Sequence, residues 1–330
     1  MCRNMRLCIK ISAMKRGKTW RFKTEDDLFE VKRLLLELGG EEKDIAADFE
    51  LWRIRLADST FTAYKTLKLY STPSDDPLVR DAVERIDQIA GALFVPPESP
   101  LMVGCDEAGK GEILGSIFVS CALVPSHLFH KLQDILRTVD TKARRHPFSY
   151  WKTIFEEIHA LKTEGLDAVI KRIPPESIDR ENINVLLDKA YVLALKALHE
   201  KHDFSDARLV IDDYGVGEIL REFIDRIRPS KVIIATRADE EYLEVLTASV
   251  ISKYFREREM DAISSDERWT IDGVSPGPGS PNNPQTLEWL KRWHESGRDW
   301  PDFVRKSYRT IAQIEGREFR RKGNRQPKRP

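Results

Sequence analysis

Two adjacent carboxylates, Asp106 and Glu107, lie between an apolar run and a basic glycine turn in the octet GCDEAGKG (104–111). Residues 101–103 before them and the apolar run 113–124 after them have the composition of buried strands. We therefore expect the acids where the first strand ends. Paired carboxylates beside a basic turn are typical of a metal-binding catalytic loop, because carboxylate oxygens are ligands that Mg²⁺ and Mn²⁺ prefer.

The backbone at this pair of acids has to meet a geometric condition. Neighbouring residues of a regular strand point to opposite faces, so Asp106 and Glu107 serve one site only if the chain twists out of the strand there. Gly109 and Gly111 permit such a twist. The alternative is a polar surface turn with two solvated acids, which the octet by itself does not exclude.

The octet also comes close to the phosphate-binding loop G-x-x-x-x-G-K-[ST]. Gly111 stands where that loop needs a hydroxyl group for magnesium, and Asp106 and Glu107 would place two negative charges inside the phosphate cradle. Charge repulsion disfavours a nucleotide there. We therefore expect no nucleotide cofactor, and a nucleotide-hydrolysing enzyme is the rival interpretation.

Three more acids follow later apolar runs. Asp212 and Asp213 close the segment ARLVIDDYG (207–215), and Asp239 precedes the helical segment TASVISK (247–253). Each has an ordinary structural explanation, because acids after a strand often form turns and an acid that opens a helix is often its N-cap.

The octet, the D-D-Y-G segment and the R-A-D segment together resemble the ribonucleases H of type 2, over about residues 101–315. That family opens with a strand ending in G-x-D-E-x-G-x-G, and four of its carboxylates hold two divalent metal ions. The resemblance implies this role for Asp106, Glu107, Asp212 and Asp239. We prefer Asp212 to Asp213 because the family pattern is apolar-apolar-Asp followed by one polar residue and an aromatic residue.

The resemblance implies an endonuclease that hydrolyses the RNA strand of RNA/DNA hybrids and leaves 5′-phosphate and 3′-hydroxyl ends. Two Mg²⁺ or Mn²⁺ ions roughly 3.5–4 Å apart would activate the attacking water and stabilise the leaving oxygen. We find no Ser-His-Asp or Cys-His arrangement worth proposing, and none is required. A non-catalytic hybrid-binding protein is the alternative, but it would not need four acids.

The resemblance also implies residues that contact the substrate. A glycine turn lets the backbone approach a nucleic acid closely and recognise RNA by its 2′-hydroxyl groups. The residues with an expected substrate-binding role are Gly109, Lys110 and Gly111 of the octet, Thr141 and Lys142 in a D-T-K segment, Asn184 in an I-N-V-L segment, and Lys253. A capping role for Asn184 and an ordinary surface charge for Lys253 are the alternatives.

Residues 1–91 form a separate region with its own order of elements. We expect strands at 6–12, 19–23, 49–56, 60–66 and 67–71, and helices at 25–38 and 77–90. This order and the segment TFTAYKTLKLY resemble the TATA-binding-protein-like N-terminal domain of the type HIII ribonucleases. A small α+β domain that mediates protein contacts is the alternative.

Strand alternation predicts a substrate-binding face on this region. The apolar residues Trp52, Ile54 and Leu56 share one side of their strand and should pack on the helices. The residues expected on or near the open side are Arg53, Arg55, Tyr64 and Lys65. Basic and aromatic groups on an open sheet contact phosphates and sugars without reading sequence. A solvated sheet face is the alternative.

Two sequence positions help to distinguish resemblance to type HII from resemblance to type HIII. Type HII enzymes have G-R-G in the turn and, in a later Gly-rich loop, a Tyr that stacks at a DNA–RNA junction. This chain has Lys110 and Ser280 at those positions. The differences favour type HIII and weak cleavage at a single embedded ribonucleotide. HII-like excision of single ribonucleotides is the alternative, and the segment 283–308 resembles the end of archaeal-type members.

The length of 330 residues suggests two domains. Charged residues make up 33% of the chain and hydrophobic residues 41%, and the formal net charge is zero. We expect a linker at 92–100, which carries three prolines, and a disordered basic tail at 316–330. The expected fold is α/β: a ribonuclease-H-like mixed sheet flanked by helices, preceded by a small α+β TATA-binding-protein-like domain.

The cysteines and the hydropathy indicate a cellular compartment. Cys2, Cys8, Cys105 and Cys121 show no C-x-x-C spacing, which favours reduced thiols over disulfides or zinc ligands. No signal peptide or apolar run of membrane length is present. We expect a cytoplasmic monomer whose partner is an RNA/DNA hybrid and not a membrane.

Overall fold

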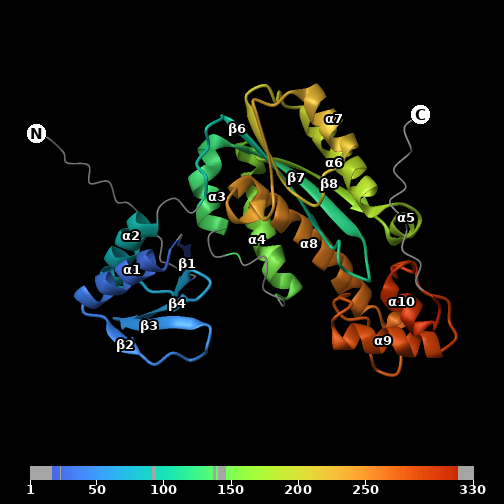
Figure 1. Cartoon of the computed structure of the whole chain (residues 1–330), viewed down its shortest axis with the longest axis horizontal. Helices are drawn as coiled ribbons and strands as arrows, with labels where there is room; N and C mark the ends of the chain where they lie inside the picture. The colour runs from blue at the N-terminus through green and yellow to red at the C-terminus, as the bar shows by residue number, and fades with distance from the viewer. Residues whose placement is uncertain (1–16, 23, 91–93, 137–138, 140–145, 319–330) are drawn as a thin grey trace, which may run out of the picture. The chain divides into compact units, whose positions relative to one another are not determined.

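The computed structural model describes residues 17–318, apart from residue 23 and the segments 91–93, 137–138 and 140–145. The chain divides into two compact units, one mainly of residues 1–93 and the other mainly of residues 94–330 (Figure 1). Among the described residues, no helix is both long enough and apolar enough to cross a membrane.

The first unit is an antiparallel sheet of five strands in the order β1-β5-β4-β3-β2, with two helices packed on one face. Its elements are β1 (Lys18–Arg21), α1 (Glu25–Glu37), β2 (Glu41–Lys43), β3 (Glu50–Leu56), β4 (Ser59–Tyr64), β5 (Lys68–Ser71) and α2 (Pro77–Ala90). Helix α1 begins at a capping box in which the Thr24 hydroxyl accepts from the amide of Asp27. It ends before Gly39, whose φ of +90° suits glycine.

Strand β3 alternates as its sequence predicts. Trp52, Ile54 and Leu56 are 4%, 0% and 1% exposed and join the core beneath the helices. Arg53 and Arg55 point to the other face of the sheet. The predicted packing of β3 is therefore confirmed.

The observed elements of the first unit differ from the expected ones in two places. Strand β2 was not expected, because its three residues are all exposed and polar and carry no apolar pattern. It forms through antiparallel pairing with β3, a contact that local sequence does not indicate. The strand expected at 6–12 lies outside the described residues.

The second unit contains a mixed sheet in the order β10-β9-β6-β7-β8, and this confirms the expected fold class. Its strands are β6 (Leu101–Ala108), β7 (Ile117–Pro125), β8 (Asp167–Ile173), β9 (Ala207–Asp212) and β10 (Lys231–Ala235). Strands β6, β9 and β10 are parallel, whereas β6, β7 and β8 pair antiparallel.

Helices cover both faces of this sheet (Figure 1). Helices α6 and α7 pack on one face, and α8 packs on the other with α3 and α4 against it. The helices of the unit are α3 (Phe129–Leu136), α4 (Phe148–Ala160), α5 (Pro175–Arg180), α6 (Ile183–His199), α7 (Glu218–Ile227), α8 (Leu243–Ser265), α9 (Pro284–Glu295) and α10 (Arg309–Ile314). Short 3₁₀ helices are η1 (Ser126–Leu128), η2 (Leu161–Glu164), η3 (Ala238–Glu240) and η4 (Glu267–Trp269).

The acids lie near the end of strand β6, as expected, but the strand is longer than the expected residues 101–103. It continues through Asp106 and Glu107 to Ala108, because pairing with β7 persists as far as Ala108 and Phe118. The parallel pairing with β9 ends earlier, at Cys105 and Ile211. The acids are therefore inside a strand but beyond the point where β9 stops.

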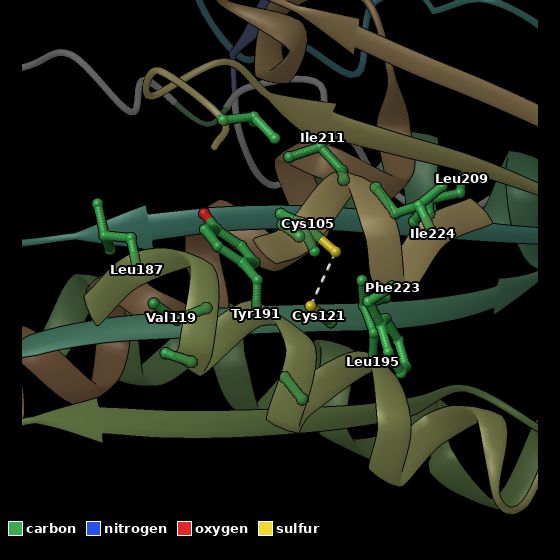
Figure 2. Packing of buried hydrophobic residues seen from close by; sticks show 14 of the residues in the cluster. Cys105, Val119, Cys121, Leu187, Tyr191, Leu195, Leu209, Ile211, Phe223 and Ile224 are labelled. Atoms are coloured by element: carbon green, nitrogen blue, oxygen red, sulfur yellow. Dashed lines mark hydrogen bonds between the residues drawn. The ribbon is translucent and has the colours of Figure 1, made fainter. Parts of the chain in front are cut away.

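The two described cysteines face each other across β6 and β7. Cys105 and Cys121 are directly paired in the register and are buried free thiols, joined by the dashed line in Figure 2. This confirms the expected state of these two residues. Cys2 and Cys8 lie outside the described residues.

The proline-rich stretch that precedes β6 is bonded to the second unit. The amide of Val95 donates to the carbonyl oxygen of Glu241 at 2.9 Å, and Arg208 Nη1 donates to the carbonyl oxygen of Pro96 at 2.8 Å. Arg208 also forms a fully buried ion pair with Glu244 at the start of α8. The residues from 94 onward thus begin the packing of this unit.

Gly104 allows β6 and α8 to approach closely. A Cβ on Gly104 would lie 2.1 Å from the carbonyl carbon of Glu244. We predict that Gly104→Ala lowers the free energy of unfolding by about 3 kcal/mol or more, because the helix backbone has to move away from the strand. Gly111→Ala is the matched control, since no atom other than those of its chain neighbours lies within 4 Å of the position that its Cβ would occupy. Denaturant unfolding measures both; equal effects would contradict the steric explanation.

Candidate active site

The four predicted acids lie on neighbouring elements of the central sheet. Asp106 and Glu107 are near the end of β6, Asp212 is the last residue of β9, and Asp239 is in η3, just after β10. Because β6, β9 and β10 are parallel neighbours, their carboxyl ends meet at one edge of the sheet. Topology therefore brings acids far apart in the sequence to the same edge.

Asp106 is buried at 8% exposure and belongs to the α8 side of the sheet. Its Oδ1 accepts from the amide of Glu107 at 2.8 Å. Burial, and next the neighbouring Glu107 carboxylate, raise the pKa of Asp106 well above its ordinary value, while Ser249 and Lys253 of α8 lower it. Lys253 therefore acts on the acid electrostatically, which supports the active-site interpretation of that lysine.

Glu107 belongs to the opposite side, where α6 packs. Tyr191 of α6 donates its hydroxyl proton to Glu107 Oε2 at 2.6 Å. Burial raises the pKa of Glu107, and the bond from Tyr191 and the charge of Lys110 lower it. The two acids thus keep the alternation of a strand, and the expected twist of the backbone out of the strand does not occur. Their carboxylates still interact, since the charge of Glu107 raises the pKa of Asp106, and the pairing with β9 ends before these acids, which leaves this end of β6 at an open sheet edge. A shared site therefore does not require the twist.

Asp212 and Asp213 have different partners. Asp212 Oδ1 accepts from the amide of Ala238 at 2.7 Å, which directs its carboxylate toward η3. Burial raises the pKa of Asp212, and the charge of Asp239 raises it further. Asp213 Oδ1 instead accepts from the amides of Gly215 and Val216, at 2.9 and 3.2 Å, and forms the turn after β9. This geometry supports the choice of Asp212.

Asp239 is not the N-cap of a helix, the role that its position suggested. The N-cap residue of η3 is Arg237, which has a φ of +58°, and the N-cap of α8 is Tyr242. Asp239 is the middle residue of η3 and is partly buried. Asp239 therefore does not occupy an N-cap position and stays a candidate metal ligand.

The donor set fits divalent cations. The charge of Glu107 raises the pKa of Asp106, and the charge of Asp212 raises the pKa values of both; a dication at the sheet edge would relieve this repulsion. Across the described residues, no three Asp, Glu, His or Cys side chains form a ready-made metal cage.

The glycine turn after β6 is held from two sides. Lys110 Nζ donates to the carbonyl oxygen of Tyr214 at 2.7 Å and lies 5.4 Å from the centre of its ring. Gly109 has a φ of +94°, and a Cβ there would lie 2.8 Å from the carbonyl oxygen of Ser116. Gly111 is exposed, so its backbone faces solvent.

Arg305 and Tyr308 complete this turn, a role that no local pattern indicates. Arg305 is fully buried and donates to the carbonyl oxygens of Gly115 and Lys110, at 2.9 and 3.3 Å. The hydroxyl of Tyr308 donates to the Lys110 oxygen as well, at 3.0 Å. An arginine in the polar segment FVRKSY resembles a surface residue, and only tertiary packing reveals its burial.

The remaining predicted site residues of the second unit are Asn184, Thr141 and Lys142. Asn182, not Asn184, caps α6 by accepting from the Asn184 amide at 2.9 Å, so the capping alternative for Asn184 is wrong. The Asn184 side chain lies beside Gly215, where a Cβ would be 3.2 Å from Nδ2. Thr141 and Lys142 lie outside the described residues.

The predicted residues of the first unit lie on or beside its open face. Arg53 forms an ion pair with Glu50 at 2.7 Å, whereas Arg55 is exposed. Tyr64 is partly buried on β4, and Lys65 is exposed in the turn that follows. These residues belong to a separate unit from the acids.

Ser280, at the position where the resemblance expects an aromatic ring, lies in a loop that is bonded to the segment following the glycine turn. The carbonyl oxygen of its neighbour Gly279 accepts from the amides of Ile113 and Leu114, at 2.8 and 3.3 Å. The loop 277–281 is therefore attached to the segment between β6 and β7. The hydroxyl group of Ser280 cannot supply the flat surface of an aromatic ring.

Comparison with known proteins identifies relatives of the second unit. The family model described as Ribonuclease HII matches residues 103–311. A ribonuclease HII of Sulfurisphaera tokodaii is 26% identical over 222 residues, which cover 67% of this chain and 99% of the relative. The crystal structure of the ribonuclease H2 from Pyrococcus horikoshii OT3 is similar with a TM-score of 0.53 and 25% identity, covering 66% of this chain and 97% of that one.

Solved structures of ribonuclease HIII are similar over most of the chain. The Bst-RNase HIII structure in complex with Mn²⁺ covers 91% of this chain and 98% of its own, with a TM-score of 0.55. Its identity to this chain is 17%, so the similarity concerns the fold. The fold shared with that protein includes the N-terminal sheet and helices.

We predict that Arg305→Gln lowers the free energy of unfolding by about 2–4 kcal/mol, because it removes the buried guanidinium's bond to the Gly115 carbonyl oxygen and one of the two bonds to the Lys110 carbonyl oxygen. Lys306→Gln is the matched control, since the Lys306 side chain is exposed and should change stability by less than about 0.5 kcal/mol. Denaturant unfolding measures both. A neutral Arg305→Gln would show that the arginine does not support the turn.

Proposed function

The chain belongs to the ribonuclease HII family, and from this we propose that it is an endonuclease that hydrolyses the RNA strand of RNA/DNA hybrids with divalent metal ions. One observation carries the proposal: the span that matches the family contains four acids, and the parallel strands β6, β9 and β10 bring them to one edge of the sheet. The proposed products carry 5′-phosphate and 3′-hydroxyl ends.

We propose Asp106, Glu107, Asp212 and Asp239 as the ligands of two Mg²⁺ or Mn²⁺ ions. When bound, such ions lower the pKa of the attacking water and stabilise charge on the leaving oxygen. The protein contributes orientation through hydrogen bonds: the Glu107 amide donates to Asp106, the Tyr191 hydroxyl to Glu107, and the Ala238 amide to Asp212.

We propose that the glycine turn distinguishes RNA from DNA. Gly109 and Gly111 carry no Cβ, so the backbone can approach 2′-hydroxyl groups that DNA lacks. Lys110 is bonded to the carbonyl of Tyr214, and Asn184 lies next to Gly215 on the same side. We propose that these residues, with Lys253 and with Thr141 and Lys142, contact the substrate backbone.

The open face of the first unit is the proposed second contact with the hybrid, and we assign residues 1–91 to it as a substrate-binding domain. Several basic and aromatic side chains share this face by strand register. They are Arg21, Lys43, Arg53, Arg55, Lys68, Tyr64 and Tyr70. Such a surface binds phosphates and sugars of any sequence.

Two observations separate the possible substrate preferences. The sequence relatives are ribonucleases HII, which favours excision of single ribonucleotides as a second candidate function. Ser280 lacks the ring that such excision would use, and the first unit resembles the fold of Bst-RNase HIII. We propose a preference for runs of ribonucleotides. The preferred metal, a monomeric state and a cytoplasmic location stay predictions.

We predict that Asp106→Asn lowers kcat by about a thousandfold or more, because several kcal/mol of transition-state stabilisation disappear with one metal ligand. Hybrid binding, measured by fluorescence anisotropy, should persist. Asp212→Asn should be comparably inactive, and Asp213→Asn should stay within about fivefold of wild type because Asp213 only forms a turn. The reverse order would identify Asp213 as the ligand.

Replacing Arg53 and Arg55 together by Ala should raise KM for long hybrids with little change in kcat, since both residues lie outside the catalytic unit. The slope of the logarithm of the binding constant against the logarithm of the salt concentration should become shallower by an amount that corresponds to about two lost phosphate contacts. The control replaces Arg80 and Arg85 of α2, on the helix side of the same unit. An unchanged KM in the first variant would refute the proposed binding face.

A duplex with one embedded ribonucleotide should be cut at least about tenfold more slowly than a duplex with four or more, because stacking on an aromatic ring is worth roughly 1–3 kcal/mol. Gel analysis of end-labelled duplexes gives both rates. Ser280→Tyr combined with Lys110→Arg should raise cleavage at the single ribonucleotide. Equal cutting by the wild-type protein would overturn the proposed preference.

A further inference from the structure

Two stacked tyrosines lie on the Glu107 side of the sheet, and neither contacts the substrate in the proposed function. Tyr191 is on α6, and Tyr214 is in the turn after β9. Their ring centres are 5.0 Å apart and the planes differ by 11°. Figure 2 shows Tyr191 pointing from α6 toward β6, within the apolar core. Both are buried, at 0% and 8% exposure.

The hydroxyl group of Tyr191 needs an explanation, because its surroundings are apolar. The apolar cluster that contains Tyr191 also includes Leu187 and Leu195 of α6 and Val119 and Cys105 of the sheet. Burying a hydroxyl group there is costly unless it is hydrogen-bonded, and a phenylalanine would fill the same space at no such cost. The partner is Glu107, whose Oε2 accepts at 2.6 Å.

Tyr214 fixes the position of the Tyr191 ring. Its own hydroxyl donates to Asp188 Oδ1 at 2.6 Å, and that oxygen also accepts from the Gly217 amide at 3.0 Å. Asp188 is 2% exposed, and a Cβ on Gly217 would lie 2.4 Å from Asp188 Oδ2. The position of Tyr214 is therefore determined by a buried carboxylate, and the ring of Tyr191 stacks on it.

The same tyrosine, Tyr214, also anchors the glycine turn. Its carbonyl oxygen accepts from Lys110 Nζ at 2.7 Å. Tyr214 is thus connected to Glu107 through the stacked ring of Tyr191, and to the turn through its backbone. A proposed metal ligand and the proposed RNA-reading turn share one support inside the core.

We propose that Tyr191 is a positioning residue, which orients the Glu107 carboxylate for divalent metal binding while the stack on Tyr214 holds it in register with the glycine turn. This inference rests on the proposed function, since it assigns Glu107 as a metal ligand. A carboxylate on a flexible side chain loses less freedom on binding when one oxygen is already fixed. Partners of metal ligands commonly contribute 10–100-fold to affinity or activity.

The test measures metal binding to the full-length protein without substrate. Free Mn²⁺ is followed by electron paramagnetic resonance in the wild type and in Tyr191→Phe. The variant keeps the ring and the stack but removes the donor. We expect its Mn²⁺ affinity to fall by about tenfold, with KM for the hybrid unchanged at saturating metal. Unchanged Mn²⁺ affinity would overturn the proposal.

Tyr214→Phe is the matched control. It removes a buried hydroxyl group from the same stack, but that group bonds Asp188 and not a proposed ligand, and Lys110 bonds to the backbone of this residue. Because this variant keeps the donor to Glu107 and weakens only the indirect support of the Tyr191 ring, we expect a loss of Mn²⁺ affinity clearly smaller than in Tyr191→Phe, about twofold to threefold. An equal loss in both tyrosine variants would show a general packing effect and overturn the specific role of Tyr191.

A double-mutant cycle tests whether Tyr191 acts through Glu107. In a Glu107→Ala background, Tyr191→Phe has nothing to orient, so the remaining Mn²⁺ affinity should not change further. A further loss there would contradict the proposal. Thermal unfolding checks each variant, and Tyr191→Leu, which also lacks the donor, replaces the phenylalanine variant if that one is unfolded. A wild-type protein that binds no Mn²⁺ would refute the proposed function and not this inference alone.

Discussion

The alternation of strand β6 is the constraint on which the site depends. Because β6 stays paired with β7 through Ala108, Asp106 and Glu107 point to opposite faces of the sheet. Each layer of the unit then has to supply a partner. Helix α8 brings Ser249 and Lys253 to Asp106, and α6 brings Tyr191 to Glu107. Both helical layers of the unit therefore contribute to the site, because each one supplies partners to one of the two acids.

Burial of these acids has an energetic consequence. Burial and charge repulsion raise the pKa values of Asp106, Glu107 and Asp212, so their ionised forms are disfavoured when no cation is present. Cations relieve this repulsion, which couples metal binding to the protonation of the site. The partners on α6 and α8 limit the repulsion without removing it. A site for divalent ions is the consistent chemical interpretation of this arrangement.

The glycine turn depends on contacts from distant parts of the chain. Arg305 and Tyr308 hold its Lys110 carbonyl from the C-terminal region, and the Tyr214 carbonyl holds the Lys110 ammonium from the other side. The turn therefore has a defined backbone although two of its residues are glycines. Recognition of 2′-hydroxyl groups needs such a defined backbone, because the discrimination rests on hydrogen-bond geometry.

The sequence by itself determined the features that local patterns control. Alternation predicted the buried side of β3, helical periodicity and proline predicted α2 at residues 77–90, and the order of acids after apolar runs indicated the family. Tertiary structure decided the rest. The length of β6 depends on its pairing with β7, and a tyrosine in an apolar helix or an arginine in a polar segment looks like ordinary core or surface. Tyr191 and Arg305 acquire their roles only through partners 84 and 190 residues away, and such long-range contacts leave no local signal.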